Sequence, residues 1–393
     1  HEPCKAQEGH HNCREDSENP LRREASDHLP CILDGAMPLP NYASSPSKIL
    51  IVRFSHLGDV VSALPLYYGL RSAFPAARIA WATQTEYAPL LEPLPGLERV
   101  ICLDRRTGLS GVKRLWHELR AFSPELTVDP QANFKSALAA LFSGASRRVG
   151  PHSNDWKEAS ARHLVTEHAA QAHGPHNLDR VAALTHHLTR SSTLRYDPSL
   201  SASELLAARA ALELRMPGEN PFLLVHLSRP NDPRSWPEER YRELALIASE
   251  QKLSTLFLSG PNEAELGRRL AANTEGVSHW VDQRGLRELA ALFTVASKRG
   301  AHLIACDSGP MHLAAACELG VTLLAGPQDE RATGAEAWGE IHTTLRSSLQ
   351  PACAPCKLRT CHHSRGPVCM KDITAQRALE AVTPLLQGAE ACV

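Results

Sequence analysis

The chain has 393 residues, of which 43% are hydrophobic and 22% are charged, and its formal net charge is -1. This length and composition predict a packed globular protein of about two or three domains. The near-zero charge argues against a nucleic-acid partner, and no apolar run reaches the roughly 18 residues that a membrane-spanning helix needs.

The first 47 residues are polar, contain several prolines and show no periodicity. Such a segment buries too little apolar surface to offset the entropy of ordering it, so we expect 1–47 to be a disordered or extended tail. It also lacks the apolar stretch of a signal peptide. We therefore expect a cytoplasmic protein, in which eleven cysteines are unusual because cytoplasmic thiols normally stay reduced.

Buried strands alternate with helices from Lys48 onward. In the first half the strands are expected at Lys48–Phe54, Arg78–Thr83, Val100–Leu103 and Leu126–Asp129, and the helices at Val60–Phe74, Thr107–Phe122, Asn133–Phe142 and Leu178–Leu188. Pro65 lies early in the first of these helices and can kink it. The alternation indicates a parallel, doubly wound sheet.

The same alternation restarts after a connecting helix, Ala202–Arg215. Strands are expected at Pro221–Leu227, Leu253–Ser259, Ala301–Cys306 and Val321–Ala325, and helices at Pro237–Glu250, Asn262–Ala272, Leu286–Ala296, His312–Cys317 and Thr374–Leu386. Two such blocks predict an α/β protein with two Rossmann-like domains, 48–200 and 201–393, that face each other across a cleft. We expect the closing helix to fold back over the first half.

The stretch Ala301–Cys317, AHLIACDSGPMHLAAAC, reads as a strand, a turn at Asp307-Ser308-Gly309-Pro310 and a small-residue helix. A helix that starts at the carboxyl end of a buried strand offers unpaired N–H groups and a positive dipole end. Gly309 would let a ligand approach the main chain closely. The turn can therefore hold the diphosphate of a nucleotide-sugar, or it can be an ordinary strand–turn–helix capped by Asp307.

Single polar residues follow other expected strands. Asp59 lies at a strand-to-helix turn, where a carboxylate can act as a general base or simply interact with the helix N-terminus. Ser228 and Arg234 can donate to phosphate oxygens, and Arg234 can neutralise a departing diphosphate or be a solvated loop charge. Glu263 can bond a ribose diol or be a first-turn helix acid.

Motifs of several other enzyme classes are absent from the sequence. No G-x-G-x-x-G follows the first strand, which disfavours a dinucleotide oxidoreductase. The chain has no G-x-x-x-x-G-K-[ST], which disfavours a P-loop enzyme, and no G-x-S-x-G nucleophile elbow.

Four segments carry a likeness to a known family. KILIVRFSHLGDVVSALPLYYGLRSAF (Lys48–Phe74) contains a strand, R-[FL]-S-x-x-G-D and an apolar helix with a proline. HLSRPNDPRSWPEERY contains a basic residue shortly before Trp-Pro, ACDSGPMHLAAA matches D-[ST]-G-x-x-H-[LI]-A, and a cysteine run follows. In this order, from about Lys48 to Leu386, they resemble the family 9 glycosyltransferases, the ADP-heptose:lipopolysaccharide heptosyltransferases.

The resemblance implies a GT-B fold and an inverting, metal-independent transfer of a heptose from ADP-heptose to the inner core of lipopolysaccharide, either to Kdo or to a first heptose. It implies that Asp59 takes the proton of the acceptor hydroxyl and that Glu263 holds the adenosine ribose. The residues implied to bind or position the donor diphosphate are Asp307, Ser308, Gly309, Met311 and His312. Arg234 stands where the family often has lysine, and its forked guanidinium is not a neutral replacement.

Basic residues cluster in and beside the helix Thr107–Phe122. They can meet acceptor phosphates or the anionic inner face of the cytoplasmic membrane, to which the protein would then be peripheral, or they can form a solvated helix face. The residues of this basic set are Arg105, Arg106, Lys113 and Arg114.

The cysteine run has the spacing C-x2-C-x4-C-x7-C and lies just before the closing helix. Its members are Cys353, Cys356, Cys361 and Cys369. Short spacing in a cytoplasmic protein suggests a structural metal site more than disulfides, although the spacing is not that of a standard zinc ribbon. Zinc, iron, a disulfide pair and reduced thiols all remain open, and catalysis is expected to need no cofactor.

Two other functions remain open at this point. One is a glycosyltransferase of the same fold that uses another nucleotide-sugar or acceptor. The other is a non-catalytic protein that binds a nucleotide-sugar. Transfer requires Asp59 to face the diphosphate turn across the cleft, whereas simple binding does not.

Overall fold

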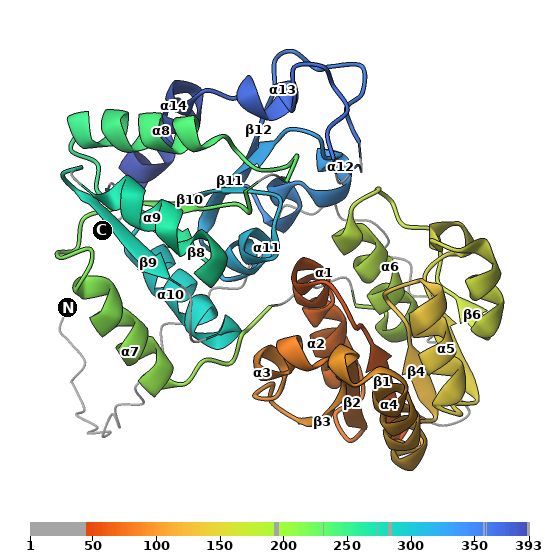
Figure 1. Cartoon of the computed structure of the whole chain (residues 1–393). Coiled ribbons are helices and arrows are strands. Elements are labelled where there is room, and N and C mark those ends of the chain that lie inside the picture. Colours follow the sequence, from red (N-terminus) through yellow and green to blue (C-terminus); the bar gives the residue numbers. More distant parts are fainter. Residues whose placement is uncertain are drawn as a thin grey trace, which may run out of the picture. The chain divides into compact units, whose positions relative to one another are not determined.

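The computed structural model describes residues 45–191, 196–230, 232–272, 274–281, 285–356, 358 and 360–390, with the main chain alone for 387–390. The expected tail lies outside these ranges except for residues 45–47. Ala43–Val393 forms one compact unit, whose elements build two α/β halves (Figure 1). None of the helices in the described ranges combines the length and apolarity of a transmembrane span.

The first half is built on a six-stranded parallel sheet in the order β3-β2-β1-β4-β5-β6. Its strands are β1 Lys48–Val52, β2 Arg78–Gln84, β3 Leu97–Leu103, β4 Leu126–Val128, β5 Arg147–Gly150 and β6 Glu167–His168. Its α-helices are α1 Leu57–Ser62, α2 Leu64–Ala73, α3 Ala88–Leu91, α4 Gly108–Phe122, α5 Phe134–Phe142 and α6 Asn177–Thr189. Its 3-10 helices are η1 Thr85–Tyr87, η2 Arg105–Thr107, η3 Ser153–Asp155 and η4 Ala159–Leu164.

The second half repeats this plan with a six-stranded parallel sheet in the order β12-β11-β10-β7-β8-β9. Its strands are β7 Leu223–His226, β8 Thr255–Ser259, β9 Val277–Val281, β10 His302–Cys306, β11 Gly320–Ala325 and β12 Thr343–Arg346. Its α-helices are α7 Ala202–Glu213, α8 Glu238–Glu250, α9 Ala264–Ala271, α10 Leu286–Lys298, α11 Gly309–Ala316, α12 Glu330–Thr333, α13 Val368–Lys371 and α14 Ala375–Glu390. Its 3-10 helices are η5 Pro261–Glu263 and η6 Ala335–Trp338.

Both sheets have the same winding. The first strand of each half is central, the next two strands lie to one side, and the chain then crosses to the other side. The strand order therefore reverses between β1 and β4 and between β7 and β10. In open α/β sheets, ligands bind at such reversals, beside the carboxyl ends of the strands.

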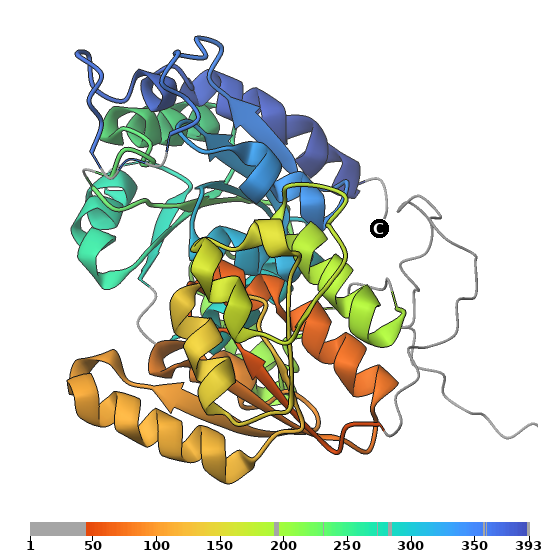
Figure 2. The same ribbon diagram turned by 90° about the vertical axis from the view of Figure 1, so that its right-hand side faces the viewer.

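Helices cover both faces of each sheet (Figures 1 and 2). On one face of the first sheet, Leu115 and Leu119 of α4 and Ala139 of α5 share a buried apolar cluster with β1 and β2. On the second sheet, Leu244 of α8 and Leu379 of α14 pack over β7, β8 and β10. The long apolar strands are buried on both faces because helices flank them there.

The predicted alternation is confirmed, with local differences. The expected helix Val60–Phe74 breaks at Ala63 into α1 and α2, and Pro65 lies in the first turn of α2, where a proline has no intrahelical bond to lose. Four strands toward the sheet edges were not predicted: β5, β6 and β12 are short, and β9 has only one buried residue. The boundary between residues 200 and 201 remains a prediction.

The expected path of the closing helix is wrong. α14 does not fold back over the first half, since its main contacts are with α8, β10 and β11 of the second half. Leu379, Val382 and Leu386 are buried in the cluster that covers the second sheet. The apolar stripe of α14 thus completes the core of its own half.

Candidate functional site

Asp59 lies in the first turn of α1, directly after the central strand β1 of the first half. The main-chain N–H of His56, the N-cap residue, donates to Asp59 Oδ2 at 3.1 Å. The Asp59 side chain is 22% exposed. The carboxylate therefore stands at the strand-order reversal of the first sheet, held by its own helix start.

Two side chains fix the other oxygen of this carboxylate. Arg53 Nη2 lies 2.7 Å from Asp59 Oδ1, and Asn177 Nδ2 donates to the same oxygen at 2.9 Å. Burial by itself would raise the pKa of Asp59, but the charge of Arg53 and the N–H of His56 outweigh it and hold the pKa below its ordinary value. Asp59 is therefore ionised at neutral pH, and its orientation is determined.

Sequence reasoning missed Arg53 and Asn177 as parts of this site. Arg53 also donates through Nη1 to the main-chain oxygen of Pro130 at 3.0 Å, which ties it to the loop after β4. Asn177 begins α6 and reaches Asp59 from 118 residues further along the chain. The arginine of R-[FL]-S-x-x-G-D was a signal for the first, but no local pattern marks the second.

The turn between β10 and α11 has the expected form, but its cap differs. Ser308, not Asp307, is the N-cap, and its Oγ accepts from the N–H of Met311 at 3.4 Å. α11 starts at Gly309, so Pro310 lies in its first turn as expected. His312 Nε2 lies 3.5 Å from Asp307 Oδ1, and His312 Nδ1 has no hydrogen-bond partner within the described ranges.

α1 and α11 pack against each other, which joins the two halves at their helix starts. A Cβ built on Gly58 would overlap His312 Cδ2, and one built on Gly309 would lie 2.7 Å from the Cβ of Leu57. Both glycines thus permit a close approach that any side chain would prevent. The structure therefore brings the Asp59 turn and the Asp307–His312 turn together.

α6 also reaches this junction. His176 is its N-cap, and the His176 ring accepts from the N–H of Leu178. Burial lowers the pKa of His176 to about 4, and the nearby His312 adds to the lowering. His176 is therefore neutral at pH 7, so it adds no charge beside Asp59 and Asp307.

Ser228 follows β7, the central strand of the second half. Its N–H donates to the hydroxyl of Tyr241 at 3.2 Å, and that hydroxyl lies 3.2 Å from Ser228 Oγ. The Tyr241 ring packs edge-on against Trp236 and Phe257, with centroids 5.1 and 6.4 Å away. Buried aromatic residues thus fix the position of Ser228.

Arg234 is held by an acid that sequence reasoning overlooked. Arg234 Nε and Nη2 donate to the two oxygens of Asp232 at 3.0 and 2.8 Å, and its side chain is half exposed. The hydrogen bonds that Arg234 donates to Asp232 raise the pKa of Arg234, and the charge of Asp307 contributes to the rise. The guanidinium therefore lies within electrostatic reach of the turn before α11.

Glu263 ends the short helix η5 after β8 and is buried. A Cβ built on Gly260 would lie 3.0 Å from Glu263 Oε2, so the carboxylate lies directly against the end of the strand. Ser228, Glu263 and Asp307 thus follow β7, β8 and β10, which are neighbours in the sheet. Carboxyl ends of parallel strands share one edge, so the predicted donor residues lie along a single sheet edge.

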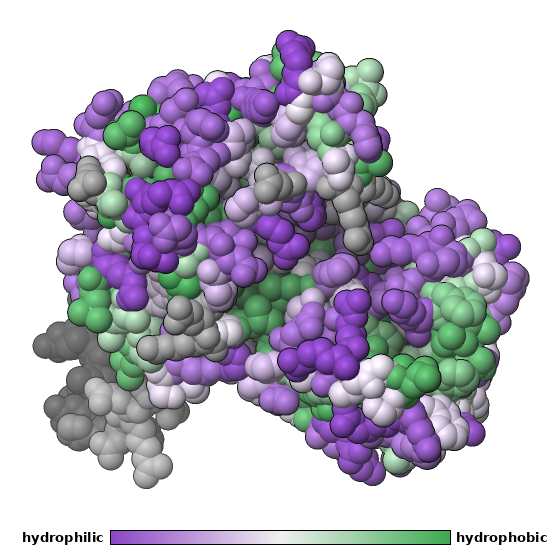
Figure 3. Space-filling view, viewed as in Figure 1, coloured by the Kyte–Doolittle hydropathy of each residue, from purple (hydrophilic) through white to green (hydrophobic). Residues whose placement is uncertain are grey.

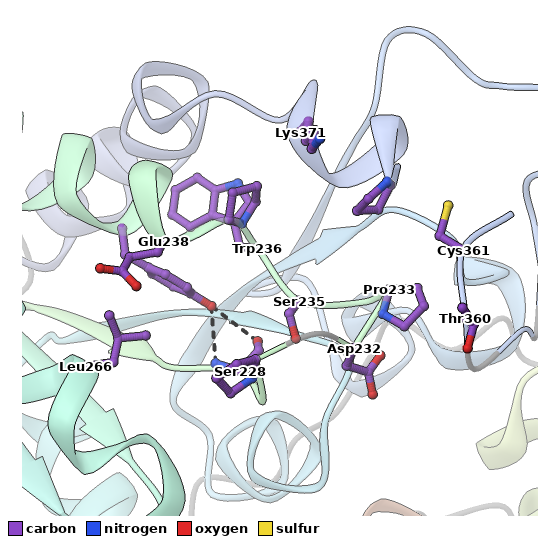
Figure 4. A pocket seen from close by; sticks show the side chains of 14 residues that line it. Ser228, Asp232, Pro233, Ser235, Trp236, Glu238, Leu266, Thr360, Cys361 and Lys371 are labelled. Carbon is purple, nitrogen blue, oxygen red and sulfur yellow. Dashed lines mark hydrogen bonds between the residues drawn. The ribbon is translucent and has the colours of Figure 1, made fainter. Parts of the chain in front are cut away.

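A cavity of about 470 Å³ lies beside this edge (Figure 4). Ser228 is the one predicted donor residue in its lining. The loop after β7 forms one wall and Thr360, Cys361 and Lys371 form the other. The indole N–H of Trp236 donates to the main-chain oxygen of Ile373 at 2.8 Å, which fastens this loop to the start of α14.

The four cysteines line a small cavity next to this one. Cys353 is exposed, Cys356 and Cys361 are partly exposed, and Cys369 is buried, all as free thiols. Burial raises the pKa of Cys369, and the nearby Cys356 and Cys361 add to the rise. Within the described ranges no three His, Cys, Asp or Glu side chains are arranged to hold a metal ion, so the expected structural metal is not supported.

The basic set lies on η2 and on the exposed side of α4. One member of the set, Arg105, acts electrostatically on the same tyrosine as Asp59. Burial and the neighbouring Glu86 raise the pKa of Tyr87, and the charges of Asp59 and Arg105 also act on it. Tyr87 is therefore within electrostatic reach of both charges.

The site thus combines an ionised, oriented carboxylate from the first half with a helix N-terminus from the second half. A hydroxyl placed against Asp59 can lose its proton to it as its oxygen attacks an electrophilic carbon. The amides of α11 and the charge of Arg234 can stabilise an anion that leaves on the other side. This is the arrangement that group transfer from a phosphate-activated donor needs.

Known proteins with a similar chain include lipopolysaccharide heptosyltransferase 1 of Pseudomonas aeruginosa, which is 26% identical over 369 residues that cover 87% of this chain and 99% of the relative. The E. coli heptosyltransferase WaaC with ADP has a similar structure, with a TM-score of 0.65 and 20% identity over 88% of this chain and 99% of that one. The structure of E. coli ADP-heptose lps heptosyltransferase II is also similar, with a TM-score of 0.67 and 22% identity. The match covers 87% of this chain and 99% of that one.

These structures confirm the expected two-domain GT-B fold. The family profile described as Glycosyltransferase family 9 (heptosyltransferase) matches residues 112–365, more than half of the chain. The match begins after Asp59 and includes the turn before α11. The chain therefore belongs to glycosyltransferase family 9.

Proposed function

We propose that this glycosyltransferase moves a heptose from ADP-heptose to the inner core of lipopolysaccharide, onto Kdo or onto a heptose already attached, with inversion at the anomeric carbon. The observation that carries the proposal is the packing of α1 on α11, which sets Asp59 beside the turn of Asp307 and Ser308. The names of the relatives, lipopolysaccharide heptosyltransferases, support the substrate class.

Asp59 is the proposed base. Its lowered pKa makes it a weak base toward a free hydroxyl. The acceptor oxygen becomes far more acidic as it bonds to the anomeric carbon, so the proton moves to Asp59 late in the attack. Catalysis then depends on the position of the carboxylate, which Arg53, Asn177 and the N–H of His56 fix.

The start of α11 is the proposed site of the donor diphosphate. The main-chain amides of Ser308, Gly309 and Met311 and the positive end of the helix would face the phosphate oxygens. His312 would donate from its partnerless Nδ1 or from Nε2. Asp307 would position the donor beside this turn.

Arg234 is the proposed cation for the departing diphosphate. Its fork is now occupied by Asp232, so donor binding would exchange a carboxylate for phosphate oxygens of the same bidentate geometry. Asp232 then acts as a resting partner that keeps the guanidinium oriented when no donor is bound. The pair is half exposed, which makes the exchange inexpensive.

The nucleoside end of the donor would extend along the second sheet edge. Glu263 is placed after β8 to accept from the ribose hydroxyls, and Ser228, after β7, would donate to the phosphate nearest the ribose. The proposed transfer needs no metal or organic cofactor, because Asp59 supplies the base and the amides of α11 with Arg234 supply the positive potential. The four cysteines enter the proposal only as thiols.

The acceptor would approach from the first half. The residues proposed to meet its phosphates are Arg105, Arg106, Lys113 and Arg114, and the charges of Arg105 and Asp59 both act on Tyr87. Because a lipopolysaccharide precursor is anchored in lipid, the protein would work in the cytoplasm at the inner face of the cytoplasmic membrane.

The test is a donor and acceptor screen of the purified protein. ADP-heptose, a UDP-sugar and a GDP-sugar are each combined with Kdo-lipid and with a heptosylated acceptor, and products are read by mass spectrometry. The proposal predicts a product of one added heptose with ADP-heptose alone among the donors. Transfer from a UDP- or GDP-sugar would refute the donor, and no transfer alongside tight ADP binding would favour a non-catalytic binding protein.

A further inference from the structure

The outer side of α4 carries an apolar stripe next to its cations. Leu109, Val112 and Trp116 are 88%, 50% and 41% exposed. Their spacing of three and four residues places them along one side of the helix. The residues that pack inward, among them Leu115 and Leu119, lie on the side of the helix next to this stripe. The stripe is therefore an outward face that α4 does not use to build the core.

α5 continues this apolar surface. Phe134, Leu141 and Phe142 are 46%, 37% and 44% exposed, and the partly buried Leu138 lies between them. α5 packs beside α4 on the same face of the first sheet. Of the thirteen large apolar side chains exposed in the described ranges, these two helices contribute six, and green surface gathers there in Figure 3. The concentration marks the two helices as a patch.

Cations surround the same patch. From 105 to 122 and from 134 to 142 the chain has six arginines or lysines against one acid, Glu118. These cations are Arg105, Arg106, Lys113, Arg114, Arg120 and Lys135, all exposed. The whole chain has a net charge of -1, so the positive charge is a local property of these helices.

We infer that this docking face, formed by the outward residues of α4 and α5, binds the surface of a bilayer that contains anionic phospholipid. Apolar side chains that alternate with arginine and lysine on one helix surface are the pattern of helices that lie in the headgroup region. Trp116 adds the amphipathic ring that favours this depth. The cations add attraction to anionic headgroups.

A second copy of the chain fits this face poorly. A two-fold dimer would set six cations against the same six, and Asp104, which pairs with Arg106, and Glu118 offset only part of that repulsion. An acidic protein partner would satisfy the charge but is expected to need a groove or pocket for apolar anchors. The docking face is instead two neighbouring helix surfaces, and the apolar side chains project from them singly.

The face also lies where a lipid-borne acceptor would be useful, and this step rests on the proposed function. α4 and α5 follow β3 and β4, so both helices start at the carboxyl edge of the first sheet, as α1 does. Leu109 and Phe134 are near those starts. Docking through them would hold the Asp59 edge close to the headgroups, where a sugar on a lipid is presented.

The test is co-sedimentation of the full chain with vesicles of phosphatidylcholine alone or with about one third phosphatidylglycerol. Wild-type protein should bind the anionic vesicles at least tenfold more tightly, and high salt should weaken the binding. In the double variant Leu109→Ser and Trp116→Ser, the affinity for the anionic vesicles should fall tenfold or more. The control variant, Leu206→Ser and Leu214→Ser, removes two exposed leucines at α7, and its affinity for the anionic vesicles should fall less than twofold.

A second pair, Phe134→Ser and Phe142→Ser, repeats the test on α5 if the first pair unfolds. Equal binding to both vesicle types, or equal losses in the α4 and α7 pairs, would overturn the inference. So would self-association that the α4 substitutions abolish. The sugar donor is absent from this assay, so its result is independent of the donor screen.

Discussion

The contact between Gly58 and His312 offers a sharp test of how the two halves meet. A Cβ at position 58 would overlap His312 Cδ2 and lie 3.0 Å from Cγ, whereas ordinary contact starts at 3.4 Å. The His312 side chain is only 10% exposed, so the ring has little room to turn away. Gly58→Ala should therefore push α1 and α11 apart by about 1 Å.

A shift of about 1 Å between the groups that react can cost about 100-fold in rate. This corresponds to about 2.7 kcal/mol in the free energy of the transition state. Overpacking at this contact should cost about 1–3 kcal/mol of stability, and the helix preference of alanine over glycine, up to about 1 kcal/mol, offsets part of it. The signature of Gly58→Ala is thus a large loss of transfer in a protein that still folds.

The assay compares kcat/KM for transfer, the Kd of ADP and the thermal midpoint in four proteins: wild type, Gly58→Ala, His312→Ala and the double variant. Without the His312 ring the alanine finds space, so Gly58→Ala should cost less than about threefold in that background. ADP binding should stay within about threefold of wild type in the Gly58→Ala protein. An equal 100-fold loss in both backgrounds would refute the steric explanation.

Three further predictions follow from single contacts. Arg53→Met removes the cation that lowers the pKa of Asp59, so the acid limb of the pH–rate profile should move to higher pH, as initial rates from pH 4 to 8 would show. Among the cysteines of the described ranges, iodoacetamide should alkylate the exposed Cys353 first and the buried Cys306 and Cys317 last, because burial raises the pKa of Cys306 to about 11 and that of Cys317 to about 12; peptide mass spectrometry reads the order. Trp236→Phe leaves a buried main-chain oxygen before α14 without its donor and should cost about 1–3 kcal/mol of unfolding free energy, measured by denaturant titration.

The central strands could be predicted from the sequence because they are buried on both faces and therefore appear as continuous apolar runs. β1 and β10 are examples, with four and five fully buried residues. The edge strands could not be predicted in this way, since β6 has two residues and β12 is mostly half-exposed. A short ladder at an edge depends on its neighbour strand more than on its own side chains.

The site divides in the same way. Asp59 and the turn at Ser308 were predictable because each follows an apolar strand and opens a helix. Asn177 was not, because its bond to Asp59 joins residues 118 positions apart. The pairing of Arg234 with Asp232 was also not predicted, although the two lie two residues apart, because a local sequence does not say whether a loop arginine binds a ligand or a neighbouring carboxylate.

The packing surface of α14 could not be predicted from its sequence. Its apolar stripe predicted a packed helix, but an amphipathic pattern does not say which surface it will cover. The second sheet offered an open apolar face over β10 and β11, and α14 fills it. The cysteine run is similar, since its spacing suggested a metal site that the arrangement of the thiols does not support.

The most direct measurement is the rate of transfer by Asp59→Asn at saturating ADP-heptose. Asparagine keeps the size of the side chain but cannot take a proton from the acceptor. The account predicts that kcat falls at least 1,000-fold, within the range expected for loss of a general base, while the Kd of ADP-heptose changes by less than about threefold. A variant that turns over at the wild-type rate would contradict the account.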